Sequence, residues 1–166
     1  MNKPEEIKIK KYQRIIAEFV TPKHYPWRFI DNPYKVLISE FMLHRTRADQ
    51  VSPIYEEFIK NYPSIENFNE EEDEKIFKQL KSLGLFWRIR GLINAVRQLY
   101  EIHNKIPLDY DSLIDIEGIG PYIAGAVVCF AGNQPVPLID TNTVRVVGRV
   151  FGLNLRGEAR RRKEMR

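Results

Sequence analysis

The chain has 166 residues, of which 43% are hydrophobic and 29% charged, and its formal net charge is +4. This balance is typical of a globular protein and excludes a disordered chain. No apolar run approaches the ~20 residues of a membrane helix, so no membrane partner is expected. The single cysteine, Cys129, excludes an internal disulfide and any zinc or iron–sulfur site built only from cysteines of one chain.

Helical spacing of apolar residues predicts an all-α chain. Ser52-Pro53 is interpreted as a helix start, and Asp140 or Thr141 as the N-cap of the last helix. The valines of that last segment would also suit a strand, but the sequence offers no second strand to pair with it. The expected helices cover residues 7–20, 34–43, 52–62, 74–83, 88–103, 110–116, 122–131 and 138–151.

The positive charge is concentrated at the end of the chain. Residues 154–166 contain six basic and two acidic side chains, so residues 1–153 carry equal numbers of each sign. A basic segment of this kind suits a polyanion such as DNA, and it is equally compatible with the solvated end of a charged helix.

Gly118-Ile119-Gly120 separates two short predicted helices. Glycines let a backbone approach a phosphate closely, and Pro121 begins the next helix, whose free N–H groups attract an anion. The same glycines would also serve a tight turn that needs only their backbone freedom. The motif alone leaves both interpretations open.

Two carboxylates stand in apolar surroundings. Asp140 follows an apolar pair and opens a predicted helix, which suits either a helix cap or a carboxylate at a cleft edge. Glu40 lies in an apolar helix, where burial is costly without a partner or a task, and a salt bridge with Arg45 or Arg149 is the simpler alternative. Together the two carboxylates could act as acid and charge stabiliser if their pKa values are separated.

Six short blocks between residues 26 and 151, taken in order, resemble those of the helix-hairpin-helix (HhH-GPD) DNA glycosylase superfamily. This group contains endonuclease III, adenine DNA glycosylase and the thymine mismatch glycosylases. The blocks are Pro26-Trp27-Arg28; Asp31-x-Pro33-Tyr34; Ile38-Ser39-Glu40-x-Met42-Leu43-x-Arg45-Thr46; Leu83-Gly84-Leu85 with Arg88 and Arg90; Gly118-Ile119-Gly120; and Ile139-Asp140-x-Asn142-x-Val144-Arg145-Val146.

The resemblance implies two helical lobes with a cleft between them. A six-helix lobe would span residues 30–137 and include the helix-hairpin-helix at about 110–131. The second lobe would combine residues 1–29 with 138–166. Most close relatives continue past position 151 for several helices and end in a four-cysteine iron–sulfur loop. We therefore expect an incomplete second lobe with a truncated C-terminal part, and no iron–sulfur cluster in this chain.

The resemblance also implies base-excision repair, in which a mismatched base is flipped out of double-stranded DNA and its N-glycosidic bond is hydrolysed. Asp140 matches the catalytic aspartate that stabilises the cationic sugar, and Glu40 matches a pocket glutamate that binds or protonates the base. Tyr122 stands where bifunctional members carry a Schiff-base lysine. A monofunctional enzyme with little or no AP-lyase activity is expected, with Tyr122 lining the base pocket or, alternatively, packing in the core.

Further positions match the family's DNA contacts. His44, Arg45 and Leu85 match residues that fill the gap left by the flipped base and probe the opposite base, although Arg45 could instead only neutralise Glu40. The 118–120 hairpin matches a phosphate-binding site, often with a Na+ or K+ ion held by its backbone. No side-chain metal site and no other cofactor are expected, and the location implied is cytoplasmic, at the nucleoid.

The choice of base is less constrained. Leu43-His44-Arg45-Thr46 and residues 128–131 resemble the thymine and uracil mismatch enzymes, which act opposite guanine. The adenine branch usually carries two glutamines at positions 44 and 45, and Asp-Gly-Asn where this chain has Asp140-Thr141-Asn142. Excision of adenine opposite guanine or 8-oxoguanine is the first alternative. A non-catalytic DNA-binding module that uses the hairpin and the basic tail is the second.

Overall fold

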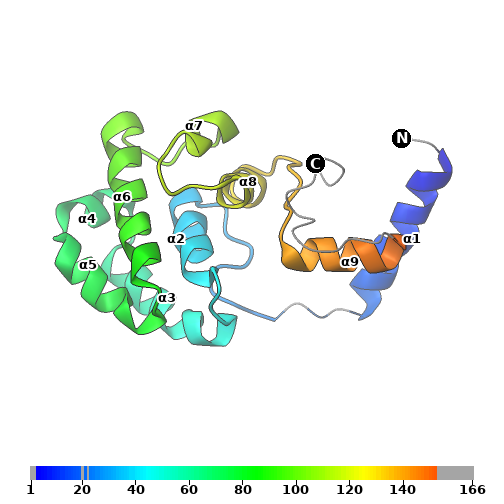
Figure 1. The fold of residues 1–166 in the computed structure, drawn as a ribbon, viewed down its shortest axis with the longest axis horizontal. Coiled ribbons are helices and arrows are strands. Elements are labelled where there is room, and N and C mark those ends of the chain that lie inside the picture. Colours follow the sequence, from blue (N-terminus) through cyan, green and yellow to red (C-terminus); the bar gives the residue numbers. More distant parts are fainter. Residues whose placement is uncertain (1–2, 20, 22, 153–166) are drawn as a thin grey trace.

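The structure is a computed structural model, and it describes residues 3–19, 21 and 23–152. Helices α2 to α8 pack together in one lobe, while α1 and α9 lie side by side beyond them (Figure 1). Among these described helices, none is both long and apolar enough to cross a bilayer. The helices are α1 Lys3–Phe19, α2 Pro33–Leu43, α3 Ala48–Asn61, α4 Ile65–Glu70, α5 Asp73–Leu80, the 3-10 turn η1 Lys81–Leu83, α6 Phe86–His103, α7 Tyr110–Ile114, α8 Pro121–Phe130 and α9 Thr141–Phe151.

The all-α prediction with two helical lobes is confirmed. In the smaller lobe, the ring of Tyr12 on α1 meets that of Phe151 on α9 edge to face, with centroids 5.7 Å apart. The expected limits of the lobes at positions 29/30 and 137/138 stay a prediction. The basic segment 154–166 lies outside the described residues.

Helix α2 is the central helix of the larger lobe and packs against α3, α6 and α8. Its start is fixed by Pro33 in the first turn and by Asn32, whose Oδ1 accepts a hydrogen bond from the backbone of Lys35 at 3.0 Å. Four of its apolar residues are each at most 4% exposed: Val36, Leu37, Phe41 and Met42. A polar side chain on such a helix must find a partner or face a cleft.

The helices differ from the prediction most at the starts of α1 and α3, each four residues earlier than expected, and in α4, which was not predicted. Helix α3 begins at Ala48, one turn before the expected start, and Pro53 lies inside it. The extra turn is held because Val51 is fully buried and its N–H, like that of Gln50, donates to the carbonyl of Arg47. Helix α4 was not expected, because only two of its six residues are buried apolar side chains and this is too few to show a periodicity.

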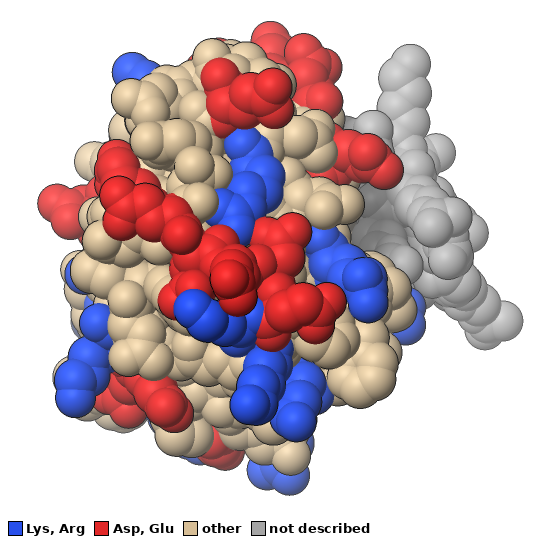
Figure 2. Space-filling view, turned by 90° about the vertical axis from the view of Figure 1, so that its left-hand side faces the viewer, with Lys and Arg blue, Asp and Glu red and all other residues tan. Residues whose placement is uncertain are grey.

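Acidic side chains gather on the face formed by α4 and α5 (Figure 2). Arg97 binds the connection between these helices: it pairs with Asp73 at 2.7 Å, donates to the carbonyl of Phe68 at 3.2 Å, and lies over the Phe68 ring. This face therefore carries an excess of negative charge, and Arg97 of α6 holds the connection between α4 and α5 in addition to their buried apolar contacts.

Candidate functional site

A cleft of about 1840 Å³ is lined by residues from separate parts of the chain. Its walls are the segment 27–31, α2, the loop 44–47, the start of α6, the hairpin glycines, both ends of α8 with the turn that follows it, and residues 139–142. Of the predicted site residues, Ile119 and Leu85 do not line it. Those that do are Glu40, His44, Arg45, Gly118, Gly120, Tyr122 and Asp140.

Asp140 is the N-cap of α9 and lines the cleft at the same time. Its Oδ1 accepts hydrogen bonds from the backbone N–H of Thr143 at 2.7 Å and from the Thr143 hydroxyl, and its Oδ2 accepts one from Asn142 at 3.1 Å. Partial burial acts to raise the pKa of Asp140, but these hydrogen bonds outweigh it and hold the pKa below its ordinary value. The carboxylate is therefore ionised at neutral pH. Asp140 is a helix cap and a carboxylate at the edge of the cleft at the same time, so the two interpretations do not exclude each other.

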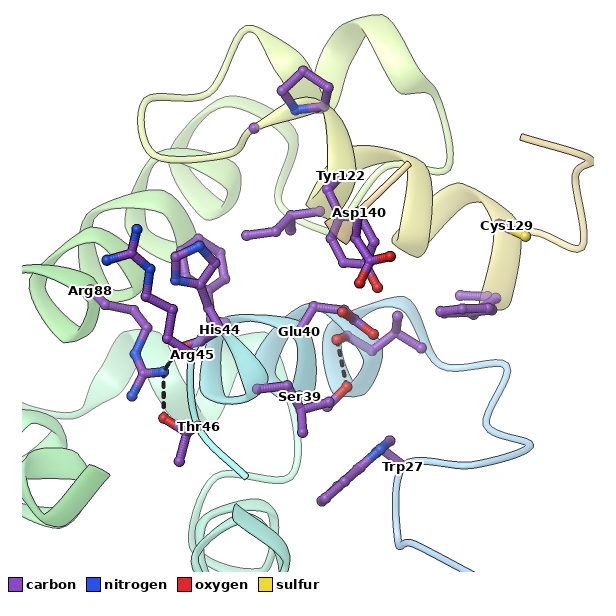
Figure 3. A pocket seen from close by; sticks show the side chains of 18 of the residues that line it. Trp27, Ser39, Glu40, His44, Arg45, Thr46, Arg88, Tyr122, Cys129 and Asp140 are labelled. Carbon is purple, nitrogen blue, oxygen red and sulfur yellow. Dashed lines mark hydrogen bonds between the residues drawn. The ribbon is translucent and has the colours of Figure 1, made fainter. Parts of the chain in front are cut away.

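Glu40 points into the same cleft from the last turns of α2 (Figure 3). Burial raises the pKa of its carboxyl to about 7, with the charge of Arg28 opposing this shift and that of Asp140 adding to it. Among the described residues, no ion pair joins Glu40 to Arg45 or Arg149. The structure therefore does not contain the alternative salt bridge, and the pKa values of Glu40 and Asp140 are separated.

Tyr122 and Arg28 lie close enough to these carboxyls to interact with them electrostatically. Tyr122 is the second residue of α8 and is 36% exposed, so it is not a core residue. Partial burial, followed by the charges of Glu40 and Asp140, raises the pKa of Tyr122 to about 12, and its phenol stays protonated. Arg28 was noted in the sequence only as part of a motif, and it supplies a positive charge at the cleft.

The two glycines of the hairpin differ in what they require. Gly118 has φ +91°, and an added Cβ would lie 3.3 Å from the carbonyl oxygen of Gly91 on α6, so glycine is needed for conformation and space. Ile119 is 4% exposed and donates its N–H to Ile116 at 3.1 Å. Gly120 has φ −88°, which any residue adopts, and open space in front of it. Gly120 is therefore not required by the turn, and its lack of a side chain keeps the start of α8 accessible.

Arg88 holds the loop that follows α2 against the start of α6. It is 3% exposed and donates to the carbonyls of Met42 at 3.0 Å, Leu83 at 3.2 Å and His44, and to Oγ1 of Thr46 at 3.0 Å. These acceptors stand on both sides of Arg45, whose backbone is left-handed with φ +60°. In the sequence, Arg88 stands on the apolar side of the predicted helix 88–103. This position is the feature that could have indicated a buried arginine, but Arg88 was noted in the sequence only as part of a motif.

Replacing Arg88 with Met is expected to lower the free energy of unfolding by about 3 kcal/mol, because buried carbonyls lose their hydrogen-bond donor. Arg90→Met is the matched control: Arg90 is exposed and lies over the Phe77 ring at 5.2 Å, so its loss should cost under ~1 kcal/mol. Urea denaturation of both variants measures the difference. Equal losses would show that the hydrogen bonds of Arg88 do not stabilise the loop.

Aromatic side chains that were not singled out in the sequence also line the cleft. Phe29, Trp87 and Phe130 are 87%, 61% and 48% exposed. Leu85, by contrast, is half-buried directly before α6, with a left-handed backbone at φ +51°. The cleft therefore combines three carboxyls (Asp31, Glu40 and Asp140), four arginines (Arg28, Arg45, Arg47 and the buried Arg88) and several exposed rings.

Among the described residues, no group of three or more His, Cys, Asp or Glu side chains is placed to hold a metal ion. Cys129 is half-buried near the end of α8 and lines the cleft. The hairpin 118–120 has no side chain with a ligating atom, so only its backbone carbonyls would be available to a cation.

Comparison with known proteins finds that the chain is similar in sequence to DNA glycosylases. Thymine/uracil-DNA glycosylase of Methanothermobacter thermautotrophicus is 33% identical over 132 residues, which are 78% of this chain and 60% of that protein. Adenine DNA glycosylase of Buchnera aphidicola subsp. Baizongia pistaciae is 34% identical over 134 residues, which are 80% of this chain and 38% of that protein. The chain thus spans about 60% or less of the length of these relatives.

Solved structures show the same fold. A thermostable thymine-DNA glycosylase superposes with a TM-score of 0.82 at 29% identity, covering 98% of this chain and 75% of that one. Endonuclease III from a non-covalent DNA complex superposes with a TM-score of 0.78 at 20% identity, covering 99% and 77%. The family model described as "HhH-GPD superfamily base excision DNA repair protein" matches residues 38–166. The chain therefore belongs to the HhH-GPD superfamily of base excision DNA repair proteins.

Proposed function

We propose that the chain is a monofunctional DNA glycosylase that removes thymine or uracil opposite guanine. The observation that carries this proposal is the pair of carboxyls in one cleft: Asp140 is held ionised by hydrogen bonds, while the pKa of Glu40 is about 7. Such a pair supplies an acid and a negative charge at neutral pH. The names of the thymine and uracil relatives, and the absence of two glutamines at positions 44 and 45, support this choice of base.

The proposed reaction uses each carboxyl once. Protonated Glu40 donates its proton to the extruded base as the bond between the base and C1′ breaks, and the bonding electrons leave with the base. The Asp140 carboxylate stabilises the positive charge that develops on the sugar. Water then adds to C1′ and passes a proton to Asp140, which leaves an abasic site and the free base.

The lack of lyase activity follows from Tyr122. Strand cleavage by this family's bifunctional route needs an amine that forms a Schiff base with C1′. Tyr122 offers a phenol whose pKa is about 12, and a phenol cannot form an imine. It lies beside Glu40 and Asp140, where it is suited to donate a hydrogen bond to the base.

The DNA would lie across the cleft side of the lobe, with one phosphate at the start of α8. Gly120 leaves this helix end open, and a Na+ or K+ ion held by the hairpin carbonyls would add positive charge there. The acidic residues over α4 and α5 do not line the cleft, so they would not oppose this contact. Because the substrate is chromosomal DNA, the protein would act in the cytoplasm at the nucleoid.

Gly120→Ala is expected to weaken binding of duplex DNA about tenfold, because its methyl group occupies the space of the phosphate. Its free energy of unfolding should stay within ~0.5 kcal/mol of wild type, since the Cβ meets no atom within 4 Å. Gly118→Ala should instead lose roughly 1–3 kcal/mol, because φ is +91°. Fluorescence anisotropy and urea denaturation measure the two effects, and a Gly120→Ala protein that binds DNA normally contradicts the phosphate contact.

Single-turnover base excision tests the proposed function. End-labelled duplexes with G·T, G·U, A·G and A·8-oxoguanine pairs are incubated with excess protein, and alkali then reveals abasic sites. Loss of thymine or uracil, with no strand cleavage before alkali, is the expected result. Excision of adenine alone would assign the protein to the alternative branch. DNA binding without any excision would leave a non-catalytic DNA-binding module.

A further inference from the structure

Trp87 is a large aromatic side chain that lies outside the buried core of the lobe. It lies in the first turn of α6, is 61% exposed, and lines the cleft. The adjacent Phe86 has a similar exposure of 56%, but its ring packs against Phe77 at a centroid distance of 5.4 Å and does not line the cleft. Two neighbouring aromatic residues thus face different surfaces, and only Trp87 faces the cleft. An exposed aromatic ring at a concave surface indicates a contact with a ligand.

The contact between Trp87 and His44 shows where along the cleft this ring lies. The two rings meet edge to face, with centroids 5.9 Å apart and planes at 84°. His44 follows Glu40 by four residues and directly succeeds α2, so it lies about one helical turn, ~5.4 Å, beyond Glu40 on the same side. Successive nucleotides of one DNA strand rise by about 3.4 Å. Trp87 is therefore placed within a few nucleotides of a base held at Glu40.

The backbone on both sides of this ring pair is held in place. Arg88, which follows Trp87, is buried and donates to Thr46 Oγ1 at 3.0 Å and to the carbonyls of Met42 and Leu83 at 3.0 and 3.2 Å. These bonds join the loop that carries His44 to the turn that carries Trp87. A tryptophan has only two side-chain torsions, so little conformational freedom is lost when its ring contacts a partner.

We propose that Trp87, supported by His44, stacks on the bases next to the flipped-out nucleotide and fills the gap left in the duplex. The proposal rests on the glycosylase function proposed above and adds the residue that recognises the opened duplex. Aromatic rings stack on all four bases, so this contact recognises the gap and not the sequence around it. The family resemblance assigns gap filling and contact with the opposite base to His44, Arg45 and Leu85. Of these three, Leu85 is half-buried and does not line the cleft.

Tryptophan fluorescence provides a direct measurement, because the chain has only two tryptophans. In a Trp27→Phe protein, Trp87 is the remaining one. Its emission should fall by about half or more when the protein is saturated with a duplex carrying a tetrahydrofuran abasic analogue opposite guanine, because stacking on bases quenches the indole. An undamaged duplex of the same sequence, bound to the same extent by anisotropy, should quench it much less.

Affinity for the abasic-analogue duplex provides the second readout. Trp87→Ala should bind it at least about tenfold more weakly, and Trp87→Phe should retain affinity within about threefold, because a smaller ring still stacks. Phe86→Ala is the matched control, an exposed aromatic outside the cleft, and should bind as wild type does. Thermal unfolding of each variant confirms that the compared proteins are folded.

Three results would overturn the proposal: unchanged Trp87 emission in fully bound protein, wild-type affinity of folded Trp87→Ala, or a loss that appears in Leu85→Ala and not in Trp87→Ala. Failure of the proposed function is distinct, since it is defined by the wild-type protein releasing neither thymine nor uracil from a duplex in which that base is opposite guanine. Binding and quenching on the abasic-analogue duplex do not require catalysis, so each proposal can fail by itself.

Discussion

Asp140→Asn is expected to lower the single-turnover rate of base excision by about 100- to 1000-fold, because it removes the negative charge that stabilises the cationic sugar. Binding of an abasic-analogue duplex should stay within about threefold of wild type, since the change leaves the hairpin and the exposed rings intact. The fold should also persist. Asparagine caps helices about as well as aspartate does, so its side-chain oxygen can still accept the hydrogen bond from the Thr143 backbone.

The chain contains a matched control for this variant. Asp109 is the N-cap of α7 and accepts hydrogen bonds from the backbone and hydroxyl of Ser112, each at 2.8 Å, but it does not line the cleft. Asp109→Asn therefore makes the same chemical change at the same kind of helix position, and excision should proceed at the wild-type rate. If both variants excise normally, Asp140 is a helix cap only and its proposed catalytic role is wrong.

Glu40→Gln is expected to stabilise the protein at alkaline pH while it impairs excision. The pKa of Glu40 is about 7 in the folded protein, above its ordinary value of 4.5, so the folded state retains a proton that the unfolded state releases. The free energy of unfolding contributed by this group therefore falls as pH rises from about 4.5 to 7. Glutamine cannot ionise, so the variant should gain under ~1 kcal/mol over wild type at about pH 5 and roughly 3 kcal/mol at about pH 8.

The excision rate should show the same titration. If protonated Glu40 acts as the acid, the wild-type rate falls about tenfold per pH unit above about pH 7, and Glu40→Gln loses this dependence together with roughly 100-fold of the rate near pH 6. Glu101→Gln, at an exposed position on α6, is the control for both measurements. Urea denaturation and single-turnover kinetics across pH 5–9 give the result. A Glu40→Gln protein whose stability tracks that of wild type at every pH would show that Glu40 titrates normally.

Much of the site could be predicted from local sequence because its features depend on near neighbours. The cap at Asp140 depends on Thr143, three residues later in the chain. The hairpin turn depends on Gly118, which lies within the turn and has a left-handed backbone. The buried face of α2 follows from apolar residues at helical spacing. Features of this range can be recognised in one sequence, and the structure contains each of them.

Other parts of the site depend on residues far apart in the chain. Arg88 reaches acceptors 42 to 46 residues away, and no local pattern shows which carbonyls an arginine will meet. Trp87 and Phe86 are adjacent exposed aromatic residues in the sequence, and only the packing of α6 determines which of them faces the cleft. Packing also decides the environment of Leu85, which is half-buried although the motif that contains it predicts a contact with DNA.

The amino-acid sequence by itself determined most of the helices, the cap at Asp140, the glycine hairpin and the family, because these follow from side chains within a few residues of one another and from their order. The tertiary structure alone decided the chemistry of the cleft. Glu40 and Asp140 are separated by most of the chain, and the pKa of Glu40 rises because packing buries it and brings Asp140 near, while Arg28 only partly opposes the shift. Desolvation and charge–charge interaction depend on three-dimensional surroundings, which helical spacing and motif order do not encode.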